Sequence, residues 1–396
     1  MKAKGSLAWR FYFIMFGYYF AQTIFFGYFT KLMTGFGYSM AFIGAMFSLN
    51  AGATIVIRTL IGYYVDKRSN PKIIVLGLFS IYALLQVLLF RFHQSVLIVV
   101  LFATLGISGA TMTTSTAEAW ALKAKQDYDE RLDYGKIRGM GSLAYGIGGL
   151  IAGSILTIWG NNGMIAFALL SWGFVMIGGF GIPNPIPRDQ TSEKDKVTFK
   201  GALRECLSDK VVVVAILGLT LAMITNNIIS TYYTLLVETL GGSSRMSGLG
   251  LFVMSFFEFL VVYSFSKISA RISSKRLMYI GMFGMALKNI VLSFAPNAIC
   301  AVVFTVVQVL AFSLVIPGTV TIISERVQYK YKATALQIMY TCTGLGGLFT
   351  NWIAGKIADV LGLQQTIRVA AIPAVIAGIV CMIFIEKTYF PRKAEN

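Results

Sequence analysis

The sequence is poor in charged residues. Asp, Glu, Lys and Arg make up only 13% of its 396 residues, whereas 56% are hydrophobic. An ordinary soluble domain carries about a quarter charged residues, so this chain could not cover a water-exposed surface. Its apolar residues occur in long runs such as 212–228 and 369–385, and a helix needs roughly 20 residues to cross a bilayer. Because backbone polar groups must be paired inside lipid, these runs predict transmembrane helices.

Residue types that commonly carry catalysis or bind metals are also scarce. The chain has one histidine, His93, and four scattered cysteines whose spacing fits neither a metal site nor a redox site: Cys206, Cys300, Cys342 and Cys381. The sequence contains no nucleotide-binding loop and no nucleophile–base arrangement, and its extramembrane segments are too short for a catalytic domain. We therefore expect a protein that is not an enzyme and has neither a cofactor nor a metal, with the cysteines serving as packing residues.

The positive charge is concentrated in alternate loops. The net charge is +17, which in a soluble protein would suggest binding to nucleic acid. Here most Lys and Arg residues lie near the termini or in every second connection between predicted spans, and the other connections are nearly bare. Nucleic-acid binding does not explain such alternation, whereas the positive-inside rule places both termini in the cytoplasm. The sequence thus predicts a multi-pass protein of a bacterial-type inner membrane, with twelve spans at 9–36, 40–65, 72–91, 95–122, 136–159, 163–182, 211–239, 246–265, 276–295, 299–324, 333–357 and 366–386.

The two halves of the chain resemble each other. The sequence Gly-Ile-Gly-Gly-Leu at 146–150 returns as Gly-Leu-Gly-Gly-Leu at 344–348, half a chain length later and again in the fifth span of its half. A polar, proline-containing stretch separates the halves. Six spans per half is an even number, so the repeats should be parallel. We predict an all-α membrane protein with a six-helix bundle at 1–184, a cytoplasmic linker at 185–210 and a second bundle at 211–396.

The end of the second predicted span carries a family resemblance. The sequence Gly62-Tyr-Tyr-Val-Asp66-Lys67-Arg68 resembles the signature loop between spans two and three of the major facilitator superfamily. The resemblance extends over the whole chain and implies alternating access around a cavity between the halves. It assigns a gating role to Gly62, Asp66, Lys67 and Arg68, and we expect a monomer in the lipid bilayer.

A narrower resemblance involves spans four and five. Ala117-Glu118-Ala119-Trp120, together with the stretch from Tyr134 to Tyr145, is similar to the oligosaccharide–proton symporters. The resemblance implies that Glu118 and Arg138 pair and hydrogen-bond a sugar, and that Tyr145 stacks on its ring. A helix-end ion pair and simple packing are the alternatives.

The later spans depart from the symporter pattern. The stretch around Glu258 is more similar to the phenylpropionate and nucleoside permease branches. Lys288, Gln308 and Ala311 stand where the symporters carry the arginine, histidine and glutamate that couple the proton. The symporters' coupling residues are therefore not carried over to this chain.

Ionisable residues inside the spans are candidates for function, because charge within lipid is costly and usually faces a cavity or a partner. Glu258, in an apolar stretch, is our candidate proton carrier; the alternative is a structural group that is neutral or paired with Lys288. Lys288 and Arg58 are candidate partners or anion contacts. Asn226 and Asn227 could bind a polar solute or bridge helices.

These features together predict a secondary transporter that uses the proton gradient to import a small polar solute, such as a sugar, oligosaccharide or nucleoside. Two alternatives stay open. One is a proton-driven exporter of drugs or metabolites, which the absence of proline from span five disfavours. The other is an importer of an aromatic or organic acid, because three cations and two carboxylates lie within the spans.

Overall fold

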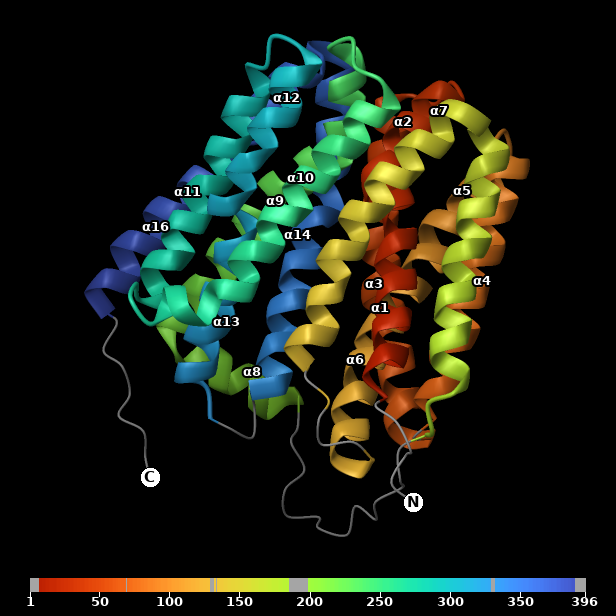
Figure 1. The fold of residues 1–396 in the computed structure, drawn as a ribbon. Coiled ribbons are helices and arrows are strands. Elements are labelled where there is room, and N and C mark those ends of the chain that lie inside the picture. Colours follow the sequence, from red (N-terminus) through yellow and green to blue (C-terminus); the bar gives the residue numbers. More distant parts are fainter. Residues whose placement is uncertain are drawn as a thin grey trace.

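The computed structural model describes residues 7–68, 70–128, 132, 134–184, 199–328 and 332–388. All regular secondary structure within these residues is helical (Figure 1), as a chain that crosses lipid requires. The helices of the described residues group into twelve long segments. Eight helical stretches among them are long and apolar enough to cross a membrane by length and composition.

The first half contains six of these segments, two of them interrupted by π-helical turns. Its elements are α1 (Ala8–Thr23), η1 (Ile24–Tyr28), α2 (Phe29–Gly35), α3 (Met40–Arg68), α4 (Pro71–Arg91), α5 (Val96–Leu101), η2 (Phe102–Gly106), α6 (Ile107–Asp127) and α7 (Tyr134–Phe180). The long α7 is two helices that reverse at Gly160, where φ is +55° and ψ is −140°. Glycine adopts this left-handed φ without the steric penalty of a Cβ atom.

The second half repeats this plan and also contains a short surface helix. Its elements are α8 (Phe199–Ser208), α9 (Lys210–Thr239), α10 (Ser244–Ser269), α11 (Ser274–Ser293), α12 (Ala298–Phe304), η4 (Thr305–Leu310), α13 (Phe312–Arg326), α14 (Lys332–Leu361), α15 (Leu363–Val369) and α16 (Ile372–Thr388). The helix α8 lies inside the predicted linker, where we did not expect a helix. Its apolar face packs on the bundle, and such packing stabilises short helices more than intrinsic propensity does.

The helix α3 continues three residues beyond the predicted end of the second span at residue 65, so Asp66, Lys67 and Arg68, which we expected in a loop, are helical. The helix α3 runs through Arg68 because the sequence has no proline before Pro71. The next helix begins immediately, with Pro71 in its first turn and the Asn70 side chain accepting a hydrogen bond from the Ile73 N–H at 3.4 Å. Asparagine as a cap followed by proline is a strong helix start.

Equivalent glycines make equivalent contacts in the two halves. Gly148 of α7 packs against α1, where a Cβ atom would lie 3.0 Å from the Phe20 carbonyl oxygen. Gly346 of α14 packs in the same way against Thr220 of α9. Small residues allow such close approach of helices in membranes. The fifth segment of each half therefore lies against the first segment of that half.

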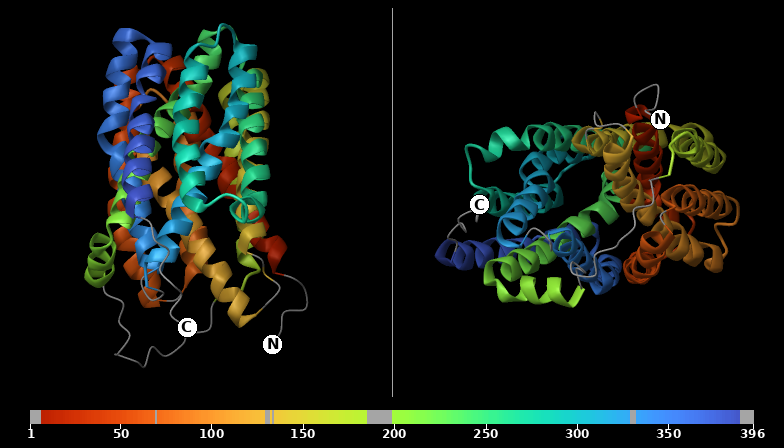
Figure 2. Two further views of the ribbon diagram at one scale, coloured as in Figure 1. Left: turned by 90° about the vertical axis from the view of Figure 1, so that its left-hand side faces the viewer. Right: turned by 90° about the horizontal axis from the view of Figure 1, so that it is seen from below.

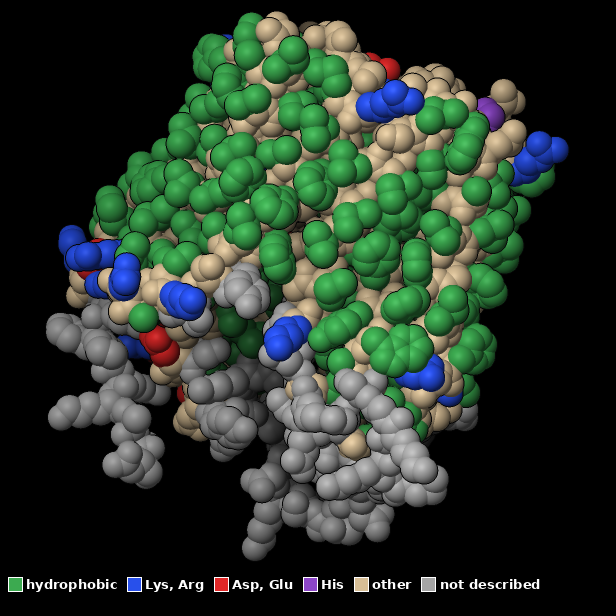
Figure 3. Space-filling view, viewed as in Figure 1, with side chains coloured by type: hydrophobic (Ala, Val, Ile, Leu, Met, Phe, Trp, Pro, Cys, Tyr) green, Lys and Arg blue, Asp and Glu red, His purple; other side chains and the backbone are tan. Residues whose placement is uncertain are grey.

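The two halves stand side by side around the long axis of the molecule (Figure 2). We call the end where α1 begins and α16 ends the lower end, as drawn in Figure 1, and the opposite end the upper end. Hydrophobic side chains cover the visible face between the two ends (Figure 3). Many large apolar side chains are exposed, among them Leu217 (58%) and Ile299 (67%), as expected for a surface that faces lipid.

Candidate functional site

The halves meet tightly at the upper end, first where α7 crosses α10. A Cβ atom on Gly248 of α10 would overlap the carbonyl oxygen of Gly149 of α7. One turn further up α7, a Cβ atom on Gly153 would overlap the carbonyl oxygen of Ser244. Only glycine lets these backbones approach so closely, so the crossing leaves no space between the halves there.

A second tight crossing joins α3 of the first half to α14 of the second. A Cβ atom on Gly44 would overlap the Asn351 carbonyl oxygen, and one on Gly355 would overlap that of Met40. Asp359 of α14 also caps α3: its carboxylate accepts hydrogen bonds from the backbone N–H groups of Met40 (3.1 Å) and Ala41 (2.9 Å). A carboxylate at a helix N-terminus is favourable because it meets unpaired N–H groups and the positive end of the dipole.

Polar side chains add further ties between α1–α2 and the second half. The Tyr28 hydroxyl lies 2.9 Å from the Gly149 carbonyl oxygen of its own half and 3.2 Å from that of Ser244 in the other. Lys31 donates to the Ser244 hydroxyl at 2.8 Å and forms an ion pair with Glu238 at 3.1 Å. Together with the two crossings, these contacts form what we call the upper seal.

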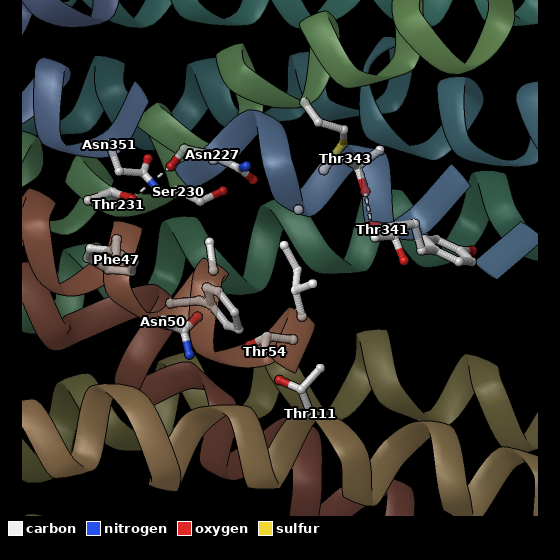
Figure 4. A pocket seen from close by; sticks show the side chains of 17 residues that line it. Phe47, Asn50, Thr54, Thr111, Asn227, Ser230, Thr231, Thr341, Thr343 and Asn351 are labelled. Carbon is white, nitrogen blue, oxygen red and sulfur yellow. Dashed lines mark hydrogen bonds between the residues drawn. The ribbon is translucent and has the colours of Figure 1, made fainter. Parts of the chain in front are cut away.

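A cavity of about 280 Å³ lies between the halves below the α3–α14 crossing. Figure 4 shows Asn50, Thr54 and Thr111 of the first half facing Asn227 and Asn351 of the second. Amide, hydroxyl and aromatic groups dominate the lining, and its described residues include no charged side chain. They are Phe26, Phe47, Asn50, Ala51, Thr54, Ile55, Thr111, Met223, Asn227, Ser230, Thr231, Tyr340, Thr341, Thr343, Gly344, Gly347 and Asn351.

The amides of the cavity are held in place but retain free hydrogen-bonding groups. Asn50 donates from Nδ2 to the Ala103 carbonyl oxygen at 2.9 Å, which fixes its side chain. Asn351 is only 6% exposed, and its Oδ1 has no hydrogen-bond partner among the described residues. A buried acceptor without a partner is unfavourable by about 1–3 kcal/mol. Asn351 is therefore a ready acceptor for a hydroxyl or N–H group of a bound solute.

A second polar cluster lies in the second half and centres on Gln308. Its Oε1 accepts from Lys288 Nζ at 2.8 Å, and its Nε2 donates to Glu258 Oε2 at 3.0 Å. Lys288 is 1% exposed and also donates to Asn226 Oδ1 at 3.1 Å. Glu258 additionally accepts from Ser142 of the first half at 3.4 Å. Gln308 thus links the buried cation to the carboxylate, and Glu258 links both to the other half.

Irregular backbone positions Gln308. The segment that carries it changes from α-helix to the 3₁₀ stretch η4, then breaks at Ala311 with φ −107° and ψ −112°. The Gln308 carbonyl oxygen accepts hydrogen bonds from the Ala311 N–H and from the Ser313 hydroxyl, each at 3.0 Å, which stabilises backbone that has left the α-helical pattern. Such 3₁₀ stretches inside a helix often mark functional hinges.

Two adjacent asparagines on α9 contact different features, one the cavity and the other the Glu258–Gln308–Lys288 cluster. Asn227 lines the cavity, whereas Asn226 accepts a hydrogen bond from Lys288. Neighbouring residues on a helix point in directions about 100° apart. One rigid element therefore contacts both the cavity and the Glu258–Gln308–Lys288 cluster.

The other predicted site residues do not line this cavity in the part of the chain that the structure describes. Glu118 lies on α6, and Tyr145 lies on α7, where its carbonyl oxygen accepts from the Thr23 hydroxyl at 3.1 Å. Their sugar-binding roles stay predictions. The side chains predicted at Arg58, Asp66, Lys67, Arg68 and Arg138 fall outside the described residues, as do the surroundings of Gly62.

Sequence reasoning missed Asn50, Thr54 and Asn351. A usable signal was present, because polar residues recur at intervals of one or two helical turns within apolar spans: Asn50 and Thr54 on α3, Asn227 and Thr231 on α9, and Thr343 and Asn351 on α14. Residues four or eight apart share a helix face. Three such polar stripes in different spans would have indicated a shared cavity.

The sequence matches the Major Facilitator Superfamily over residues 11–287 and again over 215–396. The chain belongs to this superfamily. It is thus a multi-pass membrane protein of the twelve-helix facilitator fold, and a secondary transporter rather than an enzyme. The sequence-based predictions of family, fold class and non-enzymatic function are confirmed.

Solved structures show the same fold at low sequence identity. The nucleoside transporter NupG superposes with a TM-score of 0.81 at 15% identity, covering 98% of this chain and 100% of NupG. A bacterial homologue of the human lysosomal transporter Spinster, in an inward-facing and unoccupied conformation, gives a TM-score of 0.74 at 14% identity, covering 97% of this chain and 98% of the homologue. No curated protein matches the sequence significantly. For a facilitator, a cavity between the halves that is closed on one side is the expected place for substrate.

Proposed function

We propose that this facilitator imports an uncharged polar solute, such as a sugar, oligosaccharide or nucleoside, together with protons. The observation that carries the proposal is that a polar cavity and a cluster that contains ionisable residues lie next to each other. A cavity whose lining includes amides and hydroxyls lies beside the Glu258–Gln308–Lys288 cluster, and α9 contacts both. The fold shared with the nucleoside transporter NupG supports a nucleoside as one substrate class.

The chemistry of the cavity favours an uncharged substrate over an organic acid. Hydroxyl and base N–H groups of a solute can pair with Asn227 and Asn351, while Phe26, Phe47 and Tyr340 offer faces for a sugar or base ring. A carboxylate would need a cation, because an unpaired charge in such a site is strongly unfavourable. The described lining residues offer none.

The upper seal then lies on the extracellular side, with the lower end in the cytoplasm. The positive-inside rule supports this orientation, since basic residues such as Lys72, Lys267 and Arg271 lie at the lower end. With this proposed orientation, we take the structure to be a state closed toward the outside.

Uptake into proteoliposomes tests the proposal directly. Purified protein is reconstituted and supplied with radiolabelled uridine, lactose or 3-phenylpropionate under an imposed inward proton gradient. We expect accumulation of uridine or lactose, its collapse on addition of a protonophore, and no uptake of 3-phenylpropionate. Accumulation that persists with the protonophore present would exclude proton coupling, and accumulation of the acid alone would exclude an uncharged substrate.

Replacement of Asn351 with alanine is expected to weaken binding of the accumulated solute about tenfold, because one buried hydrogen bond is lost. The measurement is the half-saturation concentration for uptake. Thr350→Ala is the matched control: this neighbouring hydroxyl donates to the Gly346 carbonyl oxygen within its own helix. An unchanged half-saturation concentration in Asn351→Ala would mean that the cavity does not bind the substrate.

A further inference from the structure

The helix α8 lies crosswise to the spans at the lower end of the second half (Figures 1 and 2). Its two faces differ in exposure and in residue type. Ala202 (0% exposed) and Cys206 (2%), one turn apart, pack into the core of that half. Burial raises the pKa of the Cys206 thiol, and the Glu205 carboxylate beside it adds to the effect. The opposite face exposes Lys200, Arg204 and, one turn further, Leu207.

The position of α8 at the start of a membrane span is fixed by its C-terminal junction. Asp209 joins α8 to α9 and accepts a hydrogen bond from the Val211 N–H at 2.9 Å, which caps α9. The other carboxylate oxygen of Asp209 forms an ion pair with Arg326 of α13 at 2.8 Å. Both residues of this pair are largely buried, so the junction is held firmly. The outer face of α8 is thereby placed at the level where α9 enters the membrane.

The exposed face carries positive charge that has no partner among the residues that the structure describes. Lys200 and Arg204 are four residues apart on one helix, and like charges at this spacing destabilise a helix. Lys210 follows at the start of α9. Among the described residues, none of these three cations forms an ion pair or a side-chain hydrogen bond. This arrangement is unfavourable unless an anion lies beside it.

Leu207 indicates where that anion comes from. Its side chain is 63% exposed, on the same side of α8 as the cations. An exposed leucine in water contributes no stabilisation from burial. At a membrane boundary its side chain can enter the acyl region while the cations remain among the headgroups. A soluble acidic partner would satisfy the cations and leave Leu207 unexplained.

We propose that the outer face of α8, defined by Lys200, Arg204 and Leu207, binds anionic phospholipid of the bilayer that the protein crosses, together with Lys210 at the start of α9. The two helix cations and Lys210 contact headgroup phosphates, and Leu207 packs against acyl chains. Because α8 also packs on α9 and α14, which line the cavity, bound lipid braces the helices beside the transport site. This site is separate from the substrate cavity and does not depend on the substrate proposed above.

Lipid titration of the purified full-length protein tests this site. Protein in dodecyl maltoside micelles is titrated with phosphatidylglycerol or phosphatidylcholine, while thermal unfolding and the number of bound lipids by native mass spectrometry are measured. We expect phosphatidylglycerol to raise the melting temperature more than phosphatidylcholine. Lys200→Gln/Arg204→Gln should bind phosphatidylglycerol about 30-fold more weakly, since each basic residue near anionic lipid contributes about a factor of five.

A control with the same change in net charge separates this site from general attraction. Arg271→Gln/Arg276→Gln removes two exposed cations at the α10–α11 connection and should retain the phosphatidylglycerol effect. Equal losses in the two double variants would overturn the proposal. So would equal stabilisation of the unmodified protein by both lipids. If the α8 variant folds poorly, about 1 M salt added to the unmodified protein should remove its lipid preference, and a preference that survives would overturn the proposal.

Discussion

A Glu258→Gln variant is expected to exchange substrate across the membrane but not to accumulate it. A proton moving down 100 mV can support about a 50-fold gradient of a co-transported solute. Glutamine cannot carry that proton, so the variant should equilibrate the solute to about equal concentrations on the two sides of the membrane. It retains a carbonyl oxygen that can accept from Gln308, so the cavity and its α9 wall should remain intact. Accumulation and counterflow of the same solute in proteoliposomes measure the two activities separately.

The control for this variant is Glu386→Gln. That carboxylate is paired with Lys275 at 2.6 Å near the lower end, far along the chain from the cluster. It should accumulate substrate like the unmodified protein. If Glu258→Gln also accumulates substrate, the proton is carried by another group. If both activities disappear although the protein folds, Glu258 serves binding or structure rather than coupling.

Gly44→Leu/Gly248→Leu is expected to prevent the upper seal from forming and to reduce uptake to background. Each leucine would overlap backbone of the opposite half, namely the carbonyl oxygens of Asn351 and Gly149. Backbone cannot move aside as a flexible side chain can, so the halves must separate at the upper end. A spin label on each half at that end should report a longer distance than in the unmodified protein.

Gly77→Leu/Gly173→Leu is the matched control, because a Cβ atom on either glycine meets no heavy atom within 4 Å. These substitutions add the same side chains and should leave transport and the spin-label distance unchanged. A Gly44→Leu/Gly248→Leu protein that transports at a normal rate would show that the seal is not part of the transport cycle.

The fold was predictable from the sequence because lipid leaves few options. Long apolar runs must be helices, and the doubled glycine motif at 146–150 and 344–348 indicated two related halves. The ends of the elements were less predictable. Asp66–Arg68 was expected to lie in a loop because of the family resemblance, yet a helix tolerates charge once it leaves lipid. α8 was missed because its stability comes from packing on α9 and α14.

The site was predictable only in part, because sequence identifies unusual residues but not their neighbours. Glu258 and Lys288 were noticed as charges within lipid, and Asn227 as an amide there. Gln308 was noticed only as a replacement for a coupling residue. Its position between Glu258 and Lys288 depends on how three segments of the second half pack, together with the 3₁₀ stretch η4. No local pattern encodes that arrangement.

The cap that Asp359 places on α3 has a consequence for the motion of the halves. When the upper end opens, the N–H groups of Met40 and Ala41 lose the carboxylate, and both sides of the contact become hydrated. All three groups already lie at an exposed edge, so protein hydrogen bonds are exchanged for water hydrogen bonds at nearly equal free energy. The contact therefore sets the register in which α3 and α14 meet when the upper end closes again. It adds little to the free-energy barrier for their separation.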